Sequence, residues 1–193
     1  MARSKEFEES VVLDKAMRLF WEQGYEKTSM TELVNHMGIH RKSLYDTFGD
    51  KHTLFLKSVD LYDHKISSAL VAGVKRSKTA TEALQFIFSS LIHHGEEHPA
   101  SGCFIVNSTV ELAARDKDMN HRSTEMFANT EKLIKDIIVW GQQEGEFTTE
   151  YNAEVLAEYL HNVGVGLRVM AKTSTTKEKL LRIATLSMDL IRR

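Results

Sequence analysis

Apolar residues recur at intervals of three and four along almost the whole of this chain, and the strict alternation typical of strands is scarce. Only one proline, Pro99, occurs in 193 residues, and the ten glycines fall mostly between the apolar stretches. Side chains with this spacing gather on one face of a helix, which is then buried against other helices. Since 42% of the residues are hydrophobic, enough to form a core, we expect an all-helical fold of about nine helices.

The charge balance limits the classes of partner. The formal net charge is −2, and residues 1–57 carry nine Lys and Arg against nine Asp and Glu, so no broad basic surface attracts nucleic acid. DNA binding would therefore depend on a local motif that is used in two copies. The first residues lack an apolar signal segment, and no apolar run reaches about 18 residues, so we expect a cytoplasmic protein with no membrane partner.

Glycines and capping residues divide the first fifty residues into three short helices. Gly24 is a helix stop. Ser29 and Glu32 form a capping box at the start of the second helix, which Gly38 ends. Only Gly38 and Ile39 separate this helix from the next, so the two helices must cross steeply, as in a helix-turn-helix. The expected helices are 8–22, 29–37 and 40–48.

A long helix follows, and Asp50 is a good N-cap for it. This helix is expected over 51–74, and its length lets it connect the short helices to the rest of the chain. Apolar periodicity predicts five more helices beyond it. They are expected over 81–97, 103–115, 120–143, 152–172 and 176–192.

Segment 20–51 resembles the DNA-binding domain of the TetR family of transcriptional regulators. The resemblance rests on the spacing of Gly24 and Gly38 and on the run Leu-Tyr-x-x-Phe-x-x-Lys over 44–51. It implies an N-terminal helix-turn-helix domain over 1–50 and a larger helical effector-binding and dimerisation domain over 51–193. It also implies a homodimer that binds pseudo-palindromic, double-stranded operator DNA as a repressor and is released by a small hydrophobic or electrophilic effector.

The short helix that begins near His40 is predicted to enter the major groove, where its first residues approach base edges. On residue type alone, Arg41 and Lys42 are ordinary solvated charges, but their place at the opening of this helix favours DNA contact. The resemblance implies phosphate contacts at the start of the second and fourth helices and at Tyr45. The predicted DNA-binding residues are Thr28, Ser29, His40, Arg41, Lys42, Ser43, Tyr45 and Lys51.

Three residues of this segment depart from the commonest family pattern. Ser or Thr is usual at the position of His40, and Tyr or His is frequent at the positions of Asp46 and Thr47. The carboxylate of Asp46 repels phosphate, so it either accepts a hydrogen bond from a cytosine amino group or points to solvent. The base sequence of the operator therefore stays open.

The resemblance implies that the last two helices pair with their copies as a four-helix bundle. Their apolar residues offer more surface than two helices bury alone, and Gly164 and Gly166 allow close approach of backbones. An intrachain core is the alternative use of the same residues. The predicted interface residues are Leu156, Tyr159, Leu160, Val163, Leu167, Leu180, Ile183 and Ala184.

An effector pocket is expected among the helices between residues 81 and 167. Aromatic side chains would form its walls, and a few polar side chains would orient the effector. Each of them also suits an ordinary place in the core or on the surface. The predicted pocket residues are Phe86, Cys103, Phe104, Asn107, Glu111, His121, Phe127, Trp140 and His161.

Cys103 is the only cysteine, so it forms no internal disulfide. With Gly102 it resembles a subgroup of the family in which Gly-Cys opens the sixth helix, and which includes the electrophile-responsive repressor of N-ethylmaleimide reductase. A thiolate at a helix N-terminus is stabilised by free amides, which favours reactivity. A buried, inert cysteine is the alternative, and both interpretations stay open.

Two other classes of function were weighed against this one. His93, His94 and His98 with Cys103 invite a metal site, but histidines near a helix end are common without one, so no metal or cofactor is expected. A di-iron enzyme needs two Glu-x-x-His motifs, and 158–161 is the only one, so no enzyme is expected. A helical adaptor without DNA binding leaves the features of segment 20–51 unexplained.

Overall fold

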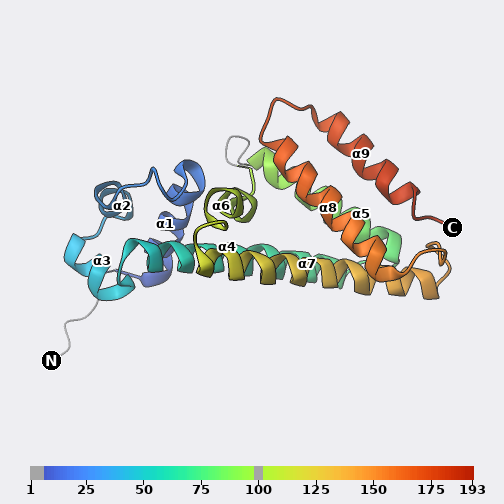
Figure 1. The fold of residues 1–193 in the computed structure, drawn as a ribbon, viewed down its shortest axis with the longest axis horizontal. Coiled ribbons are helices and arrows are strands. Elements are labelled where there is room, and N and C mark those ends of the chain that lie inside the picture. Colours follow the sequence, from blue (N-terminus) through green and yellow to red (C-terminus); the bar gives the residue numbers. More distant parts are fainter. Residues whose placement is uncertain (1–6, 98–101) are drawn as a thin grey trace.

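The computed structural model describes the backbone of residues 7–97 and 102–193, and the side chains of the same residues except 93–97. This part of the chain contains nine α-helices and no β-strand (Figure 1), which confirms the predicted all-helical fold. The helices are α1 (Glu9–Gln23), α2 (Met30–Met37), α3 (Arg41–Phe48), α4 (Lys51–Val74), α5 (Ala80–Glu97), α6 (Phe104–Leu112), α7 (Lys117–Gln143), α8 (Ala153–Ala171) and α9 (Lys177–Asp189). Among them, none is both long enough and apolar enough to cross a bilayer.

Local capping sets the ends of the three short helices. The Ser29 hydroxyl accepts from the Glu32 amide and the Glu32 carboxylate accepts from the Ser29 amide, so the predicted capping box is present. Gly38 ends α2 in the left-handed conformation, with φ of 72°, which a residue with a side chain adopts only at a cost. His40 then serves as the N-cap of α3. The helix-turn-helix is therefore formed by residues 30–48.

Helix α4 spans the predicted range and connects the two ends of the molecule. Its N-cap, Asp50, accepts from the Thr53 amide at 2.7 Å. Figure 1 shows α1, α2 and α3 gathered at one end of α4, and α5, α8 and α9 towards the other end, with α7 running beside it. One continuous helix therefore connects the three short helices to the helices at the other end of the molecule.

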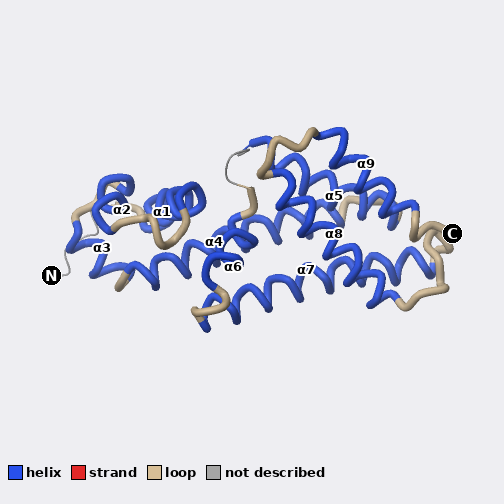
Figure 2. The backbone as a smooth tube through the Cα atoms, turned by 45° about the horizontal axis from the view of Figure 1, so that its top comes forward, coloured by secondary structure: helices blue, strands red, loops and turns tan. Residues whose placement is uncertain are grey.

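Two hydrophobic cores follow one another along α4, whose backbone is drawn in Figure 2. The first contains Phe20, Phe48, Phe55 and Phe104, and it joins α1, α2 and α3 to the first half of α4, to α6 and to the start of α7. The second lies between the end of α4 and helices α5, α7, α8 and α9. Because α6 packs into the first core, helices α1, α2 and α3 share their core with α6 and do not form a separate body. The division at residue 50 remains a prediction.

The α6–α7 corner differs most from the helix ends that the sequence predicts. Helix α6 ends at Leu112, three residues before the predicted end, and α7 begins three residues before the predicted start. The cause is Asp116, whose carboxylate accepts from the Met119 amide at 3.0 Å and so caps α7. A cap of this kind contributes about 1 kcal/mol to helix stability.

Candidate DNA-binding interface and effector site

Helix α3 buries one face and exposes the other. Leu44 and Phe48, four residues apart, are buried in the first core. The side chains of His40, Arg41 and Lys42 are exposed at the start of the helix. The face away from the core therefore carries the polar groups that the sequence assigned to base contacts, while Ser43 is partly buried.

Tyr45 and Lys51 occupy the margin of this exposed face. The Tyr45 side chain is 44% exposed, and the Arg41 guanidinium lies over its ring at 5.8 Å. The Lys51 ammonium lies over the ring of Tyr25 at 4.4 Å. The ring centroids of Tyr25 and Phe55 are 4.9 Å apart, so the Tyr25 ring is fixed by the core. Its contact with this ring holds the Lys51 side chain in place at the start of α4.

Thr28 and Ser29 differ in their access to a phosphate. Ser29 is exposed at the start of α2. The Thr28 side chain is fully buried, and its hydroxyl donates to the Gly24 carbonyl at 2.6 Å. This placement contradicts a phosphate contact by the Thr28 hydroxyl, which instead closes the turn between α1 and α2.

Glu111 connects the sensor helix α6 to that same turn. Its two carboxylate oxygens accept from the Tyr25 amide at 3.1 Å and from the Glu26 amide at 2.9 Å. Nearby, the Trp21 indole donates to the Gly102 carbonyl at 3.0 Å. Glu111 therefore holds the turn between α1 and α2, and its predicted role as a polar group for an effector stays a prediction.

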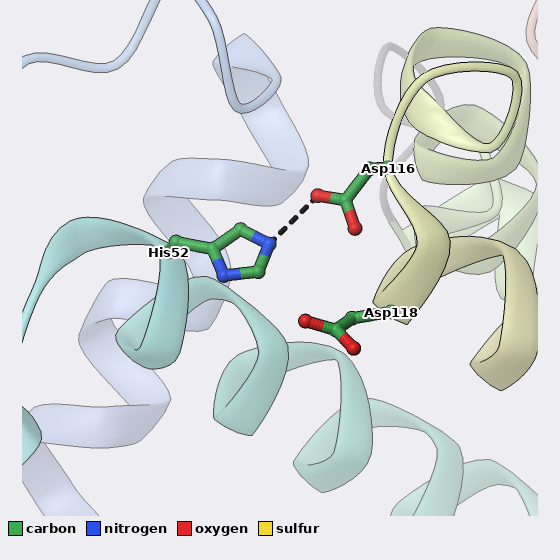
Figure 3. Close-up of side chains that lie close together, drawn as sticks. All are labelled: His52, Asp116 and Asp118. Atoms are coloured by element: carbon green, nitrogen blue, oxygen red, sulfur yellow. Dashed lines mark hydrogen bonds and ion pairs between the residues drawn. The ribbon is translucent and has the colours of Figure 1, made fainter.

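A second connection joins the first turn of α4 to the cap of α7 (Figure 3). The His52 Nε2 atom lies 2.7 Å from an Asp116 carboxylate oxygen, and the Asp118 carboxylate lies nearby. Burial alone would raise the pKa of Asp116, but hydrogen bonds from the Met119 amide and from His52 lower it overall. Because one Asp116 oxygen caps α7 and the other meets His52, these side chains are explained as a clasp that needs no ion.

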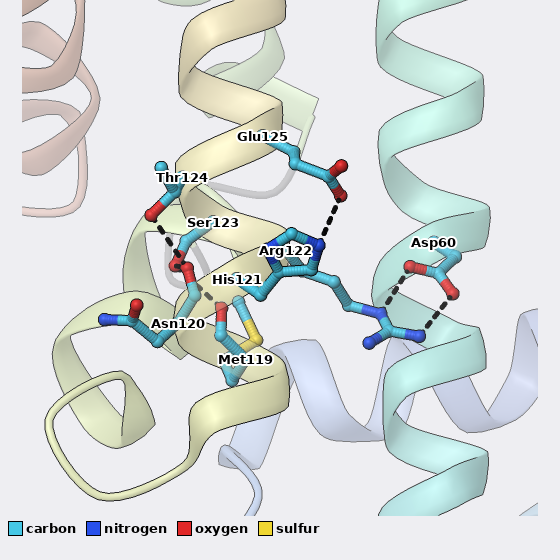
Figure 4. Close-up of polar contacts among 8 residues, drawn as sticks. All are labelled: Asp60, Met119, Asn120, His121, Arg122, Ser123, Thr124 and Glu125. Atoms are coloured by element: carbon cyan, nitrogen blue, oxygen red, sulfur yellow. Dashed lines mark hydrogen bonds and ion pairs between the residues drawn. The ribbon is translucent and has the colours of Figure 1, made fainter.

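Farther along α7, a bidentate ion pair fastens it to α4 (Figure 4). The Arg122 guanidinium donates to both carboxylate oxygens of Asp60, at 2.8 and 3.3 Å. His121 lies on the outer side of α7, where it is 72% exposed and faces Glu125 at 3.6 Å. The prediction that His121 lines an effector pocket is therefore wrong.

The remaining predicted pocket residues do not share one cavity. An open cleft of about 650 Å³ between α1, α6 and the end of α8 is lined by Phe104, Asn107 and Glu111. Phe86 and Trp140 pack instead in the second core, where the Phe86 ring lies against Gly73. A single effector cannot touch all of these residues in this conformation.

His161 lines a much smaller cavity, of about 10 Å³, between α5, α7 and α8. Phe127 contacts the His161 ring, with centroids 5.5 Å apart. Burial lowers the pKa of His161, and the nearby charge of Arg168 lowers it further. His161 is therefore mainly neutral at pH 7, and because its Nδ1 atom faces Glu131 at 3.7 Å, its other ring nitrogen is the one left for this cavity.

Cys103 lies in the first core, with 5% of its surface exposed. It is the N-cap residue of α6, and its sulfur accepts from the Tyr62 hydroxyl at 3.9 Å. Burial raises the pKa of Tyr62, and Cys103 adds to the shift. The thiol therefore faces the aromatic cluster beneath the DNA-binding helices rather than the cavity beside His161.

Most of the predicted interface residues belong to the chain's own core. Five of the eight are buried within the second core, which makes them intrachain packing residues: Leu156, Leu160, Leu167, Leu180 and Ala184. Tyr159 is exposed, and Val163 and Ile183 are partly exposed. The predicted interface set leaves out the exposed apolar residues Val155, Val169, Leu181 and Leu190, whereas Leu186, one of the apolar residues of the last helix that suggested the bundle, is exposed as well. Their signal is the helical spacing, which places them opposite the buried stripe.

The alternative metal site lies outside what the structure describes. His98 is not among the described residues, and the side chains of His93 and His94 are not described either. The described residues therefore do not test the hypothesis of a metal site, and it stays a sequence-based alternative.

Two family models match the chain. One, described as bacterial regulatory proteins of the tetR family, matches residues 12–57, and the other, a tetracyclin repressor-like C-terminal domain, matches residues 80–186. The uncharacterized HTH-type transcriptional regulator YezE of Bacillus subtilis is 30% identical over 99% of this chain and 100% of its own length. The HTH-type transcriptional repressor ComR of Escherichia coli is 30% identical over 97% of this chain and 90% of its own length.

Solved structures share the fold. A cysteine mutant of the TetR family regulator CifR, complexed with 26-bp operator DNA, superposes with a TM-score of 0.87 at 22% identity, over 98% of this chain and 100% of that one. The reduced form of E. coli NemR superposes with a TM-score of 0.84 at 17% identity, over 94% and 95% of the two chains.

Proposed function

Because the chain belongs to the TetR family of helix-turn-helix transcriptional regulators, we propose that it is a homodimeric repressor that an effector releases from a pseudo-palindromic operator. Members of this family are regulators that bind operator DNA, and the chain is not an enzyme. The dimer, the operator symmetry and the effector are the proposed parts.

The exposed face of α3 carries this proposal. Arg41 and Lys42 extend from the first turn of a helix whose other face is held by Leu44 and Phe48, so the helix is rigidly presented. Two such helices about 34 to 36 Å apart fit successive major grooves. Since the domain carries no broad positive field, both copies are needed for useful affinity.

The outer faces of α8 and α9 are the proposed dimer interface. Val155, Tyr159, Val163, Gly166 and Met170 recur every three or four residues on α8 and are exposed or partly exposed. Nothing lies within 4 Å of the place where a Gly166 side chain would begin, so another helix can approach closely there. With Ile183, Leu186 and Leu190 of α9, these residues form a continuous apolar surface.

The route of release is proposed to run through α4 and α6. The effector must bind more tightly to a conformation in which the two α3 helices no longer match the operator. Glu111 and the His52–Asp116 pair connect the DNA-binding helices to α6 and α7, so a shift of those helices moves α3. Alkylation of Cys103 by an electrophile would disturb the same contacts from within the first core.

The test is binding to the DNA upstream of the protein's own gene, measured by fluorescence anisotropy at several salt concentrations. Arg41→Ala is expected to weaken binding at least about tenfold, because a base or phosphate contact is lost. Tyr45→Phe, which removes only a hydroxyl, should weaken it by a smaller factor. Lys78→Ala is the matched control, since Lys78 is exposed in the connection between α4 and α5 and its loss should leave affinity unchanged. Equal loss in all three variants, or no binding by the unchanged protein, would reject the proposal.

A further inference from the structure

Arg168 is a cation that makes no direct polar contact with the part of the chain that the structure describes. It lies on α8, is partly buried, and lines the small cavity between α5, α7 and α8. With the described residues it forms no hydrogen bond and no ion pair. A partly buried guanidinium normally has an acceptor, because an unpaired buried charge is costly. This cavity is therefore supplied with a positive charge that no hydrogen bond or ion pair from the described residues neutralises.

The rest of the cavity defines what an acceptor would have to look like. His161, Gly164 and Arg168 recur on one face of α8, and the missing side chain of Gly164 lets Leu91 of α5 pack close to the backbone between the imidazole and the guanidinium. The other walls are mainly apolar, and they include Phe88, Leu91, Ile134 and Leu160. Thr130, also in the lining, uses its hydroxyl to donate to the Met126 carbonyl. The polar groups that remain to meet a ligand are Arg168 and His161.

We infer that the effector is an amphipathic anion, with a carboxylate bound by Arg168 beside His161 and an apolar body placed between α5, α7 and α8. A guanidinium and a carboxylate match in a bidentate geometry that no neutral group reproduces. The inference rests on the proposed function, because it names the chemical class of that repressor's effector.

Two carboxylates near the cavity, those of Asp63 and Glu131, allow a test of whether the cavity prefers a negatively charged ligand. Asp63 on α4 is partly buried and within electrostatic range of Arg168, although the two form no ion pair. Burial raises the pKa of Asp63, and the charge of Arg168 opposes the shift. Glu131 lies 3.7 Å from His161. Both carboxylates repel an anionic effector, so Arg168 must supply the preference for a negative charge.

Entry of such a molecule requires the cavity to open. A space of about 10 Å³ holds about one water molecule. Leu91 of α5 fills the site, since a side chain at Gly164 would begin 3.0 Å from its methyl group. A ligand in this cavity must therefore separate α5 from α8, so it binds more tightly to the separated conformation than to the closed one. This difference in affinity is what a switch needs.

The experiment compares ligands that differ only in their polar group. Octanoate and 4-phenylbutanoate are titrated into the full-length protein by isothermal titration calorimetry at pH 7. For each acid, the amide and the amine with the same carbon skeleton are titrated in the same way. We expect the carboxylates to bind at least about tenfold more tightly than the amides. Arg168→Gln should remove this preference and change amide affinity little, and Asp63→Asn should tighten carboxylate binding. Arg76→Gln, which removes an exposed arginine elsewhere, is the charge-matched control.

Several outcomes would overturn the inference. They are equal affinity for acid and amide, tighter binding of the amine, a preference that survives Arg168→Gln, or no carboxylate binding at millimolar concentration. Operator release by the same compounds is followed by anisotropy. If the protein binds its operator but carboxylates do not release it, the anionic class is wrong and the repressor stands. If it binds no operator at all, the proposed function fails whatever calorimetry shows.

Discussion

Gly24 shows how one residue connects the DNA-binding helices to the sensor. Its φ is +85°, a backbone conformation that favours glycine, and a side chain there would begin 2.9 Å from a Glu111 carboxylate oxygen. We predict that Gly24→Ala lowers the free energy of unfolding by about 2 kcal/mol, from backbone strain and displacement of Glu111. Chemical denaturation measures this.

Gly145 is the matched control for this substitution. It also has a positive φ, +75°, but its missing side chain faces open space except for Arg193 at 3.8 Å. Gly145→Ala should therefore cost only the backbone strain, about 1 kcal/mol. Equal losses for the two variants would mean that Glu111 does not hold the turn.

Asp116 makes stability depend on pH. Its pKa in the folded protein is below the ordinary value of 3.8, so its stabilising contribution is complete above that value and is lost as the pH falls through the lowered one. Asp116→Asn keeps an N-cap but removes the charge that faces His52. We predict a loss of about 0.5 to 1 kcal/mol at pH 7 that disappears once the pH falls below the lowered pKa of Asp116, measured by urea denaturation across pH.

Asp118 provides the comparison, because it lies in the same place without a hydrogen bond or ion pair from its carboxylate to the described residues. Asp118→Asn should change stability by less than about 0.3 kcal/mol. If both variants lose the same stability, the carboxylate that faces His52 has no special role.

At the scale of elements, the outer faces of α8 and α9 are the proposed dimer interface. Leu186 is 60% exposed on α9, where a bundle with a second copy would bury it. We predict that Leu186→Glu converts the dimer into monomer at micromolar concentration, because two unpaired carboxylates would be buried near the twofold axis. Light scattering coupled to size exclusion measures the mass.

Val110 supplies the control for that substitution. It is 82% exposed on α6 and is not part of the proposed apolar surface of α8 and α9, so Val110→Glu should leave the mass unchanged. A monomeric unchanged protein, or a Leu186→Glu variant that stays dimeric, would contradict the interface.

Helix positions could be predicted from sequence because the signals for them are local. The capping box at Ser29 and the stop at Gly38 each need only a few neighbouring residues. The start of α7 was predicted three residues late, because Asp116 was not recognised as its cap. His121 was assigned to a pocket although Met119 and Ser123 form the buried stripe of α7 and place it outward.

The site could be predicted only in part, because its other members meet through contacts distant in sequence. The exposed start of α3 follows from helix periodicity, whereas Glu111 meets Tyr25 across 86 residues. The sequence placed Glu111 and His161 in one pocket, although they lie at a cleft and at a cavity formed by different helices. Arg168 was missed, although its spacing of seven from His161 puts both on one face of α8.

At the scale of the whole molecule, the first core makes Cys103 a point of communication between the two ends. The thiol is buried, and its neighbours Tyr62 and Phe104 belong to the aromatic cluster beneath α1. Burial should make its reaction with N-ethylmaleimide slower than that of free cysteine, unless the core opens. An adduct has no room there, so alkylation must separate α6 from the DNA-binding helices.

We therefore predict that one equivalent of adduct, counted by mass spectrometry, lowers operator affinity at least about tenfold, with Cys103→Ser binding DNA normally and resisting the reagent. The order of events decides the mechanism. If operator DNA slows alkylation, the same opening both exposes the thiol and releases DNA, because ligands that stabilise one state reduce access to the other. If alkylation proceeds at the same rate on and off DNA, or leaves affinity unchanged, Cys103 is an inert part of the core and release depends on the cavity beside Arg168 alone.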